Sequence, residues 1–389
     1  MIQRAELYEL VRLNTLRFKD DPRYCLSTVS DGFACRRGRE DDTALLNRIC
    51  TAYIKAAARQ RFAPRTFGPT KWWQQISGKK LRQVTHALAT RDIDALQLMY
   101  RNFFRDPCST GLVGLPVDMQ QCYFSGEIPA FYKHFFLGDA LHRIDLWKAW
   151  TGGEYPLHVL AAPDTGNPYG VLIDGVFIRI AAEYQHFYAQ EIARLLDPKR
   201  SGVVLEIGGG FGGMAYYLIR DNPGVTYLNF DTPETTALAS YYLLKSFPNL
   251  TAALYGEAEL TPELLNNSDI ILMPSFELPQ LCDASVDVSF SSHVLADLSA
   301  QAVCEYIDQL ARITRDHILL LDRSDTRPSV SRRLCRKSGR FNLVRKCATF
   351  WDSARALRTD QTECLYSACP TILSMKPARQ AATDKIFEF

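Results

Sequence analysis

Apolar residues in the second half of the chain fall into short, nearly continuous runs, separated by turn residues and by segments of helix length. Residues 203–207 form such a run, Val-Val-Leu-Glu-Ile, as is typical of parallel strands covered on both faces. Further strands are predicted at 226–231, 269–274, 287–291 and 318–322, and a final antiparallel pair at 341–349 and 364–368. The pattern predicts an α/β fold with a Rossmann-like, doubly wound sheet.

The first third of the chain instead repeats apolar residues at helical spacing. Helices are predicted over 1–18, 43–58, 77–88 and 92–104. The aromatic-rich stretch 131–150 is more typical of a buried helix than of a sugar-stacking surface. Residues 169–180 alternate around Asp174-Gly175, which predicts a β-hairpin, and 181–196 predict a helix that leads into the sheet.

These elements divide the chain of 389 residues into four parts. We predict an N-terminal helical cap or substrate region over 1–125 and connecting helices with a hairpin over 126–200. A catalytic domain follows over 201–375, and a C-terminal tail over 376–389. A chain of this length can hold more than one domain.

The strand at 203–207 ends in a glycine-rich turn. Its sequence runs Glu206-Ile-Gly-Gly-Gly-Phe-Gly-Gly213, and a helix is expected from near Gly213. Gly208, Gly210 and Gly213 have the GxGxxG spacing of dinucleotide sites, and glycines there let the backbone approach a ligand closely. The turn therefore predicts a nucleotide cofactor, bound by Glu206, Gly208, Gly209 and Gly210.

Two acids bear on which cofactor binds. Glu206 lies within the end of the strand, where it can face the cationic amino acid end of S-adenosylmethionine but would repel the pyrophosphate of a dinucleotide. Asp231 ends the next predicted strand, and its carboxylate can accept both ribose hydroxyls of either cofactor. The turn therefore favours S-adenosylmethionine, with a purely structural glycine loop as the alternative.

The order of several motifs resembles the sugar O-methyltransferase family of bacterial polysaccharide and natural-product clusters, over roughly residues 130–370. The motifs are Glu206 to Gly213, Phe230-Asp-Thr-Pro-Glu234, Ser240-Tyr-Tyr-Leu with Phe247-Pro248, Gly166-Asn-Pro-Tyr-Gly170, Asp174-Gly175 and His186-Phe-Tyr-Ala189. Ser291-Ser-His293 with Asp297-Leu298 resembles the family's Asn-Ser-His and Glu-Met segment, with Ser291 and Asp297 as departures. The resemblance implies a class I methyltransferase fold and does not name the substrate. We expect an S-adenosylmethionine-dependent O-methyltransferase that acts on a hydroxyl of a sugar or of a glycosylated or natural-product acceptor.

His293 is the candidate general base. It follows a predicted central strand, at the sheet edge where α/β proteins bind ligands, and a neutral imidazole can take the hydroxyl proton as methyl transfer proceeds. Capping or packing is the alternative role for this histidine. Asp297, four residues on, is a second catalytic candidate that could share a helical face with His293 and orient it, or could accept the substrate proton in a dyad.

Further residues are assigned to the site by their place after predicted strands or on the helix beside the resemblance motifs. Thr232, Ser275, Phe276, Ser291 and Ser292 are predicted to contact the cofactor, with Phe276 stacking on adenine as one reading and serving as an ordinary loop aromatic as the other. His186, Tyr188 and Asp322 are candidate substrate contacts; an exposed or core-packed position is the alternative for His186 and Tyr188, whereas Asp322 could bind sugar hydroxyls. Asp322 and Asp325 could hold a divalent ion, but no His/Asp spacing indicates a metal site, and none is predicted.

Composition narrows the functional classes. The net charge of +2 gives no case for nucleic acid binding. Residues 1–150 are mildly basic, with 23 Lys and Arg against 15 Asp and Glu, compared with 22 against 28 in the remainder; this suits either a solvated face or an anionic acceptor such as a nucleotide-linked sugar. The 11 cysteines include no CxxC pair and are expected to be reduced.

We expect a cytoplasmic protein, since residues 1–20 have no apolar signal core and no uncharged stretch is long enough for a membrane span. The expected partner is a small-molecule or glycan acceptor, without nucleic acid or membrane, and a homodimer is compatible with the sequence. Two alternative functions stay open. One is a catalytically idle methyltransferase-like binding protein, and the other is an NAD(P)-dependent oxidoreductase, which would need a separate hydride-transfer set of residues.

Overall fold

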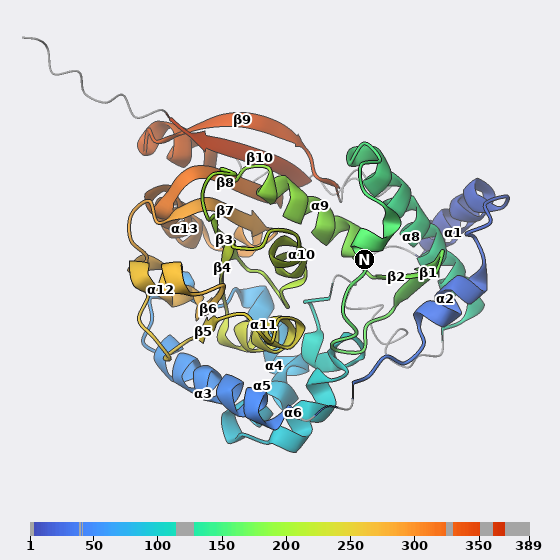
Figure 1. Cartoon of the computed structure of the whole chain (residues 1–389), viewed down its shortest axis with the longest axis horizontal. Coiled ribbons are helices and arrows are strands. Elements are labelled where there is room, and N and C mark those ends of the chain that lie inside the picture. Colours follow the sequence, from blue (N-terminus) through green and yellow to red (C-terminus); the bar gives the residue numbers. More distant parts are fainter. Residues whose placement is uncertain are drawn as a thin grey trace, which may run out of the picture.

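The computed structural model describes residues 4–38, 40, 42–113, 128–323, 330–350 and 361–369. Its central feature is an eight-stranded sheet (Figure 1). The strands are β3 (Val203–Ile207), β4 (Thr226–Asp231), β5 (Ala252–Leu254), β6 (Ile270–Pro274), β7 (Val286–Ser292), β8 (Thr314–Arg323), β9 (Phe341–Ala348) and β10 (Gln361–Ala368). Their order in the sheet is β5-β6-β4-β3-β7-β8-β10-β9.

The first six of these strands in that order are parallel, whereas β10 and β9 form an antiparallel edge. The connecting helices are α10 (Gly213–Asp221), α11 (Pro233–Ser246), α12 (Pro262–Asn267) and α13 (Ala300–Ile313). Strand β3 lies between β4, which precedes β6 in the sequence, and β7, which follows β6. The direction in which successive strands are added to the sheet therefore reverses at β3. The predicted α/β, Rossmann-like fold is confirmed.

Side chains of the parallel strands alternate between two hydrophobic cores. On β3, Val204 packs in the core that contains α10, α11 and α9 (Ala182–Ala193). Leu205 and Ile207 pack in the second core, with α12 and α13. Figure 1 shows these two groups of helices on opposite sides of the sheet. Both faces are covered, which explains why the strand sequences are apolar on both sides.

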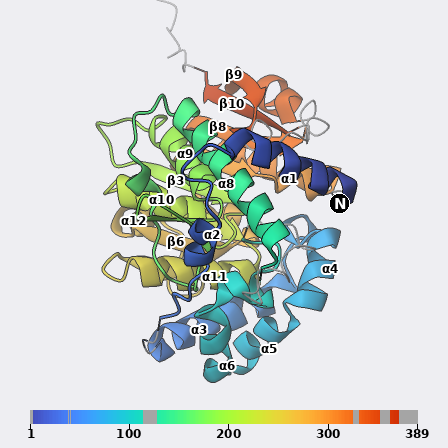
Figure 2. The same cartoon turned by 90° about the vertical axis from the view of Figure 1, so that its right-hand side faces the viewer.

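The N-terminal helices divide into two groups. They are α1 (Arg4–Phe18), α2 (Leu26–Gly32), α3 (Thr43–Gln60), α4 (Lys71–Lys80), α5 (Arg82–Thr90) and α6 (Ile93–Tyr100). Helices α1 and α2 pack on α8 (Ala130–Trp150), and α2 also contacts the hairpin of β1 (Gly170–Ile173) and β2 (Val176–Arg179). Helices α3 to α6 lie together on the side of α11 (Figures 1 and 2).

Most predicted elements are found near their expected positions, but one N-terminal helix is not. The expected helix at 77–88 is divided by Leu81, which leaves the helical conformation (φ −94°, ψ 5°) and is buried. The first of the two resulting helices, α4, begins earlier, because the Thr70 hydroxyl accepts from the backbone N–H of Trp73 at 3.0 Å and caps it. The short strand β5 and helix α13 were not predicted.

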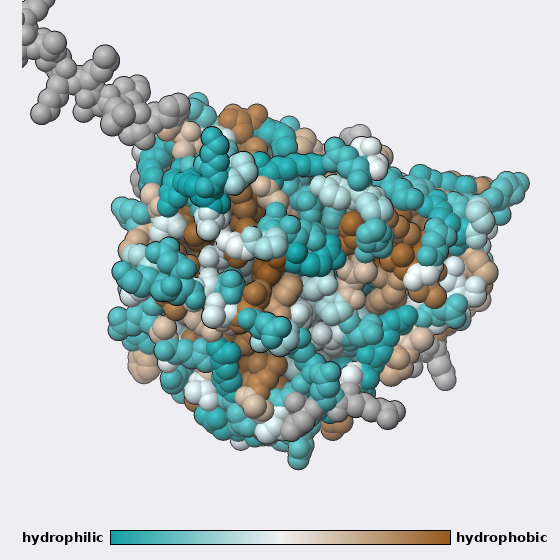
Figure 3. Space-filling model, viewed as in Figure 1, coloured by the Kyte–Doolittle hydropathy of each residue, from teal (hydrophilic) through white to brown (hydrophobic). Residues whose placement is uncertain are grey.

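The face of the molecule that Figure 3 shows is largely hydrophilic. Figure 3 shows hydrophobic residues gathered in a band down the middle of one face. Among the described residues, no helix is both long enough and apolar enough to cross a membrane.

A buried ion pair joins two helices beside the sheet. Arg143 on α8 contacts Glu183, in the first turn of α9, with 2.8 Å between Nε and Oε1. The two side chains are only 5% and 3% exposed. Burial raises the pKa of Glu183, and the arginine opposes that rise. The pair therefore fixes the position of α9 relative to α8.

We predict that Glu183→Gln destabilises the fold by about 3 kcal/mol, because it removes the buried partner of Arg143 and leaves only the part-exposed Asp139, 3.3 Å away, as its counter-charge. Urea unfolding monitored by circular dichroism measures this loss. Glu154→Gln is the matched control, since Glu154 forms an exposed ion pair with Arg194, and it should change stability by less than about 0.5 kcal/mol. Equal effects of the two substitutions would contradict the assigned role of Glu183.

Candidate active site

A cavity of about 670 Å³ lies at the carboxyl ends of the central strands. This size is within the range of small-molecule and cofactor sites. Its wall includes the ends of β3, β4 and β7, the residue after β6, one face of α9, and segments of the N-terminal region. Of the residues predicted for the site, the wall contains Tyr188, Glu206, Gly208, Gly209, Gly210, Asp231, Thr232, Ser275, Ser292, His293 and Asp297.

The glycine turn after β3 needs glycine for two different reasons. Gly208 and Gly210 have positive φ angles of 76° and 58°, which other residues adopt at a cost. A Cβ on Gly209 would lie 2.7 Å from the Tyr227 hydroxyl. At Gly210, by contrast, a Cβ would meet only the Leu112 carbonyl oxygen at 3.8 Å. The backbone at Gly210 therefore faces open space that a ligand can occupy.

Glu206 is a buried carboxylate on the cavity wall. Its Oε2 accepts a hydrogen bond of 2.6 Å from the hydroxyl of Tyr227. Burial raises the pKa of Glu206 to about 7; the Tyr227 bond opposes the rise, and the nearby Asp231 adds to it. The carboxylate is thus placed where its negative charge is poorly solvated, and a cation in the cavity would stabilise it.

Asp231 ends the neighbouring strand. Its Oδ1 accepts from the backbone N–H of Thr232 at 2.7 Å, and its Oδ2 accepts from that of Gly210 at 3.2 Å. Burial raises the pKa of Asp231 to about 7, although these two hydrogen bonds lower it. Asp231 therefore connects β4 to the glycine turn, and each oxygen keeps further lone-pair capacity for a ligand hydroxyl.

His293 follows β7 directly and has a positive φ of 64°. Its backbone N–H donates to Leu321 of β8 at 2.8 Å, which fixes the residue in this conformation. The Nε2 atom lies 3.4 Å from the hydroxyl of Tyr184 on α9, and that hydroxyl lies 2.7 Å from Oγ of Ser292. Burial holds the pKa of Tyr184 above its usual value, so the phenol stays protonated. The three side chains form one hydrogen-bonded group in the cavity wall.

Asp297 also lines the cavity, but its expected relation to His293 is wrong. Residues 293–297 do not form an α-helix; a single 3₁₀ turn, Leu295–Asp297, stands there, and Asp297 is exposed. The positive φ of His293 prevents a helix from starting at that residue. The predicted shared helical face is therefore absent from this segment.

Four predicted site residues lie away from the cavity wall, which corrects their expected placement. Phe276 is buried in the core, edge-to-face with Tyr255. Ser291 faces away from the cavity, because successive strand residues alternate, and its hydroxyl donates to the Ile207 carbonyl at 3.3 Å. Asp322 is buried between β7 and β10.

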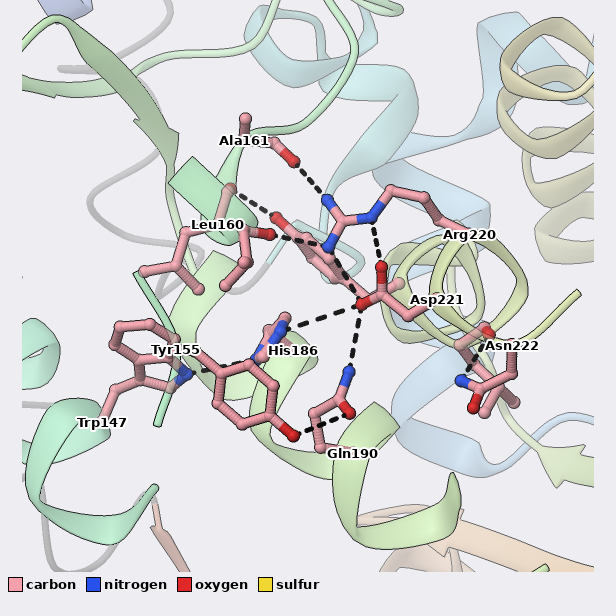
Figure 4. Close-up of polar contacts among 12 residues, drawn as sticks. Trp147, Tyr155, Leu160, Ala161, His186, Gln190, Arg220, Asp221 and Asn222 are labelled. Carbon is pink, nitrogen blue, oxygen red and sulfur yellow. Dashed lines mark hydrogen bonds and ion pairs between the residues drawn. The ribbon is translucent and has the colours of Figure 1, made fainter. Parts of the chain in front are cut away.

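The fourth is His186, whose surroundings Figure 4 shows. Its Nδ1 accepts from Nε1 of Trp147 at 3.2 Å, and its Nε2 lies 3.8 Å from Asp221. Desolvation lowers the pKa of His186 to about 4, so the ring is neutral. In the figure, Arg220 and Gln190 converge on the same Asp221. His186 therefore joins α8, α9 and α10 and takes no part in the cavity.

Several wall residues were not predicted from the sequence. Tyr184 and Gln185 are neighbours of the predicted Tyr188 on α9, and helical spacing could have indicated Tyr184, which is four residues before Tyr188. Other wall residues come from distant parts of the chain and carried no local signal. They include Phe67, Gly68, Pro69, Thr70, Trp72, Trp73, Gly111, Leu112, Tyr306 and Gln361.

In the described part of the chain, no group of three or more His, Cys, Asp or Glu residues could hold a metal ion. The predicted Asp325 lies outside the described residues.

No family model matches the chain, and no curated protein matches it. Solved structures similar to it include the mitomycin 7-O-methyltransferase MmcR, at 14% identity and a TM-score of 0.31, covering 48% of this chain and 55% of that one. Another is the magnesium protoporphyrin IX methyltransferase ChlM from Synechocystis PCC 6803 with bound SAM, at 14% identity and a TM-score of 0.35, covering 58% and 90%. A third is a SAM-dependent methyltransferase from Aquifex aeolicus. It has 15% identity and a TM-score of 0.32, and the match covers 48% of this chain and 92% of that one.

The chain thus spans little more than half of the length of the mitomycin enzyme. The resemblance to sugar O-methyltransferases stays a prediction.

The raised pKa of Glu206 predicts a pH-dependent cost to the fold. A carboxyl whose pKa rises from its usual value near 4.5 to about 7 on folding makes the ligand-free protein less stable as pH increases through that interval. At pH 8 the cost is about 3 kcal/mol. Glu206→Gln keeps an acceptor for Tyr227 and removes the charge, so it should raise stability at pH 8 and leave it nearly unchanged at pH 4.5.

Urea unfolding at the two pH values measures this difference. The exposed Glu259→Gln is the control and should show no such pH dependence. A Glu206→Gln protein that is no more stable than the wild type at pH 8 would show that Glu206 is not a desolvated carboxylate.

Proposed function

We propose that the protein is an S-adenosylmethionine-dependent O-methyltransferase that methylates a hydroxyl of a sugar or of a glycosylated or natural-product acceptor. The observation that carries this proposal is the pair of carboxylates, buried Glu206 and half-buried Asp231, on either side of an open glycine turn in a cavity of about 670 Å³. Two carboxylates suit a cationic, ribose-containing cofactor. They would disfavour the pyrophosphate of a nicotinamide dinucleotide placed at the same turn.

The residues present fit this cofactor. Glu206 would face its ammonium group, Asp231 would accept from the ribose hydroxyls, and the exposed backbone at Gly210 leaves room for close approach. The cofactor supplies a methyl group already activated by a sulfonium leaving group. The protein must then hold the acceptor in line and remove its proton.

His293 is the residue we propose for proton removal. Tyr184 has one hydroxyl proton, and when it donates this proton to Ser292 its oxygen can accept from Nε2–H of His293. The neutral imidazole would then carry its proton on Nε2 and keep Nδ1 as the basic atom. In this arrangement Tyr184 positions His293, while the acceptor hydroxyl delivers its proton to the ring.

The cofactor assignment is tested by calorimetric titration with S-adenosylhomocysteine and, separately, with NADH. We expect micromolar affinity for the first and no binding of the second. Asp231→Ala should lower the affinity for S-adenosylhomocysteine about tenfold or more, because charge-assisted hydrogen bonds are lost. Asp269→Ala is the control, because Asp269 also accepts hydrogen bonds from a backbone N–H and lies outside the cavity wall.

Binding of NADH alone would favour the oxidoreductase alternative. Binding of neither compound would favour the catalytically idle alternative.

The base assignment is tested by transfer of labelled methyl from S-adenosylmethionine to a panel of neutral monosaccharides, methyl glycosides and phenolic glycosides. His293→Ala should lower turnover of an active acceptor about 10²-fold or more and leave S-adenosylhomocysteine affinity within about threefold. His86→Ala, on the exposed surface of α5, is the matched control and should behave as the wild type. Unchanged turnover in His293→Ala would remove this histidine from the mechanism.

A further inference from the structure

Part of the cavity wall comes from the N-terminal region and not from the sheet. The turn before α4 contributes Phe67, Gly68, Pro69 and Thr70, helix α4 contributes Trp72 and Trp73, and a later loop contributes Gly111 and Leu112. These segments are separated from the glycine turn by about a hundred residues or more of sequence. Their side chains are mainly apolar and include two adjacent indoles.

Two contacts show which end of the cavity this segment covers. Nε1 of Trp73 donates to Oε1 of Glu234 at 2.7 Å, and Glu234 lies in the first turn of α11, three residues after Asp231. The ring of Phe67 packs edge-to-face on Tyr306, with centroids 5.2 Å apart. All of these neighbours lie at the Asp231 end of the cavity.

The loop that contains Gly111 and Leu112 covers the same end of the cavity, next to the glycine turn. The Leu112 carbonyl oxygen lies 3.8 Å from the position of a Cβ on Gly210. A Cβ on Gly111 would lie 3.2 Å from the Trp73 ring and 3.5 Å from the Trp72 ring. Both indoles therefore pack against this loop, which sets their positions next to Gly210, and Gly210 in turn donates to Asp231.

We propose that Trp72 and Trp73, with the 67–70 turn, form the outer wall of the nucleoside site, so that the N-terminal helices take part in cofactor binding. This rests on the proposed function. A purine is flat and apolar on its faces, and an indole offers a matching surface for stacking or edge contact. Trp72 remains 47% exposed, which is costly for a large apolar ring and is relieved when a ligand covers it.

Glu234 acts as a positioning residue in this wall. Trp73 has a single polar hydrogen, and its bond to the Glu234 carboxylate fixes the rotation of the indole. The same bond ties α4 to the amino end of α11. Loss of the acceptor would free the indole to turn, whereas an amide at this place would still accept the bond.

The test uses tryptophan fluorescence of the full chain, titrated with S-adenosylhomocysteine, adenosine and methionine. The protein has five tryptophans. We expect emission to change with S-adenosylhomocysteine and with adenosine but not with methionine. Trp72→Phe and Trp73→Phe should each remove a large part of the change. Trp150→Phe is the matched control, because Trp150 is part buried against Phe187 and Phe350 outside the cavity wall.

Calorimetry of Glu234 variants gives an independent readout. Glu234→Leu should lower the affinity for S-adenosylhomocysteine about fivefold, and the affinity of Glu234→Gln should stay within about twofold of that of the wild type. One outcome would overturn the inference and leave the proposed function standing. In it, S-adenosylhomocysteine binds, both tryptophan variants keep the full fluorescence change, and both Glu234 variants bind the ligand equally well. A signal from methionine and none from adenosine would also overturn it. If no variant and not even the wild type binds S-adenosylhomocysteine, the proposed function fails and this inference with it.

Discussion

Two neighbouring carboxylates, the buried one of Glu206 and the half-buried one of Asp231, constrain the rest of the site. Desolvation makes each of them costly to ionise, and a nearby carboxylate adds to the cost, Asp231 in the case of Glu206 and Glu234 in the case of Asp231. The protein offsets part of it locally, through the Tyr227 hydroxyl and through backbone N–H groups, including that of Gly210. The remaining cost is what a cation can relieve, so the same burial that weakens the ligand-free protein favours a positively charged ligand. The glycine turn, the cavity and the covering N-terminal segment are all arranged around this point.

The sequence was sufficient for features that a short stretch encodes by itself. The strand, the glycine turn and the helix from Gly213 lie within a dozen residues, and Asp231 follows one strand and helix later, so their relation follows from α/β geometry. It was insufficient where the direction of a side chain decides. His186 and Tyr188 were predicted together, yet residues two apart on a helix point about 200° apart. Only Tyr188 faces the cavity. The alternation of a strand separates Ser291 from Ser292 in the same way.

Residues brought from a distance could not have been found at all. The Trp73–Glu234 hydrogen bond joins positions 161 residues apart, and neither residue belongs to a motif that indicates the other.

The two faces of helix α9 have different roles, which follow from how the helix is packed. One face carries Tyr184 into the cavity, whereas the opposite face, through His186 and Glu183, anchors the helix to α8 and α10. A neutral histidine suits that anchoring face, because a charged ring would have to be solvated or paired in the interior.

The basic excess of the N-terminal region has a structural use. Arg48 pairs with Glu257 at 2.7 Å, and Arg101 pairs with Asp42 at 3.2 Å; the first of these pairs joins α3 to the sheet edge, beside β5. Within the described cavity wall the carboxylate and imidazole side chains are instead those of Glu206, Asp231, Asp297 and His293. A phosphate or nucleotide on the acceptor would therefore bring negative charge toward acids on that described wall. The arginines that raise the charge of residues 1–150 are better explained as the means by which the N-terminal helices are held in place, which in turn keeps α4 and its two indoles at the cavity.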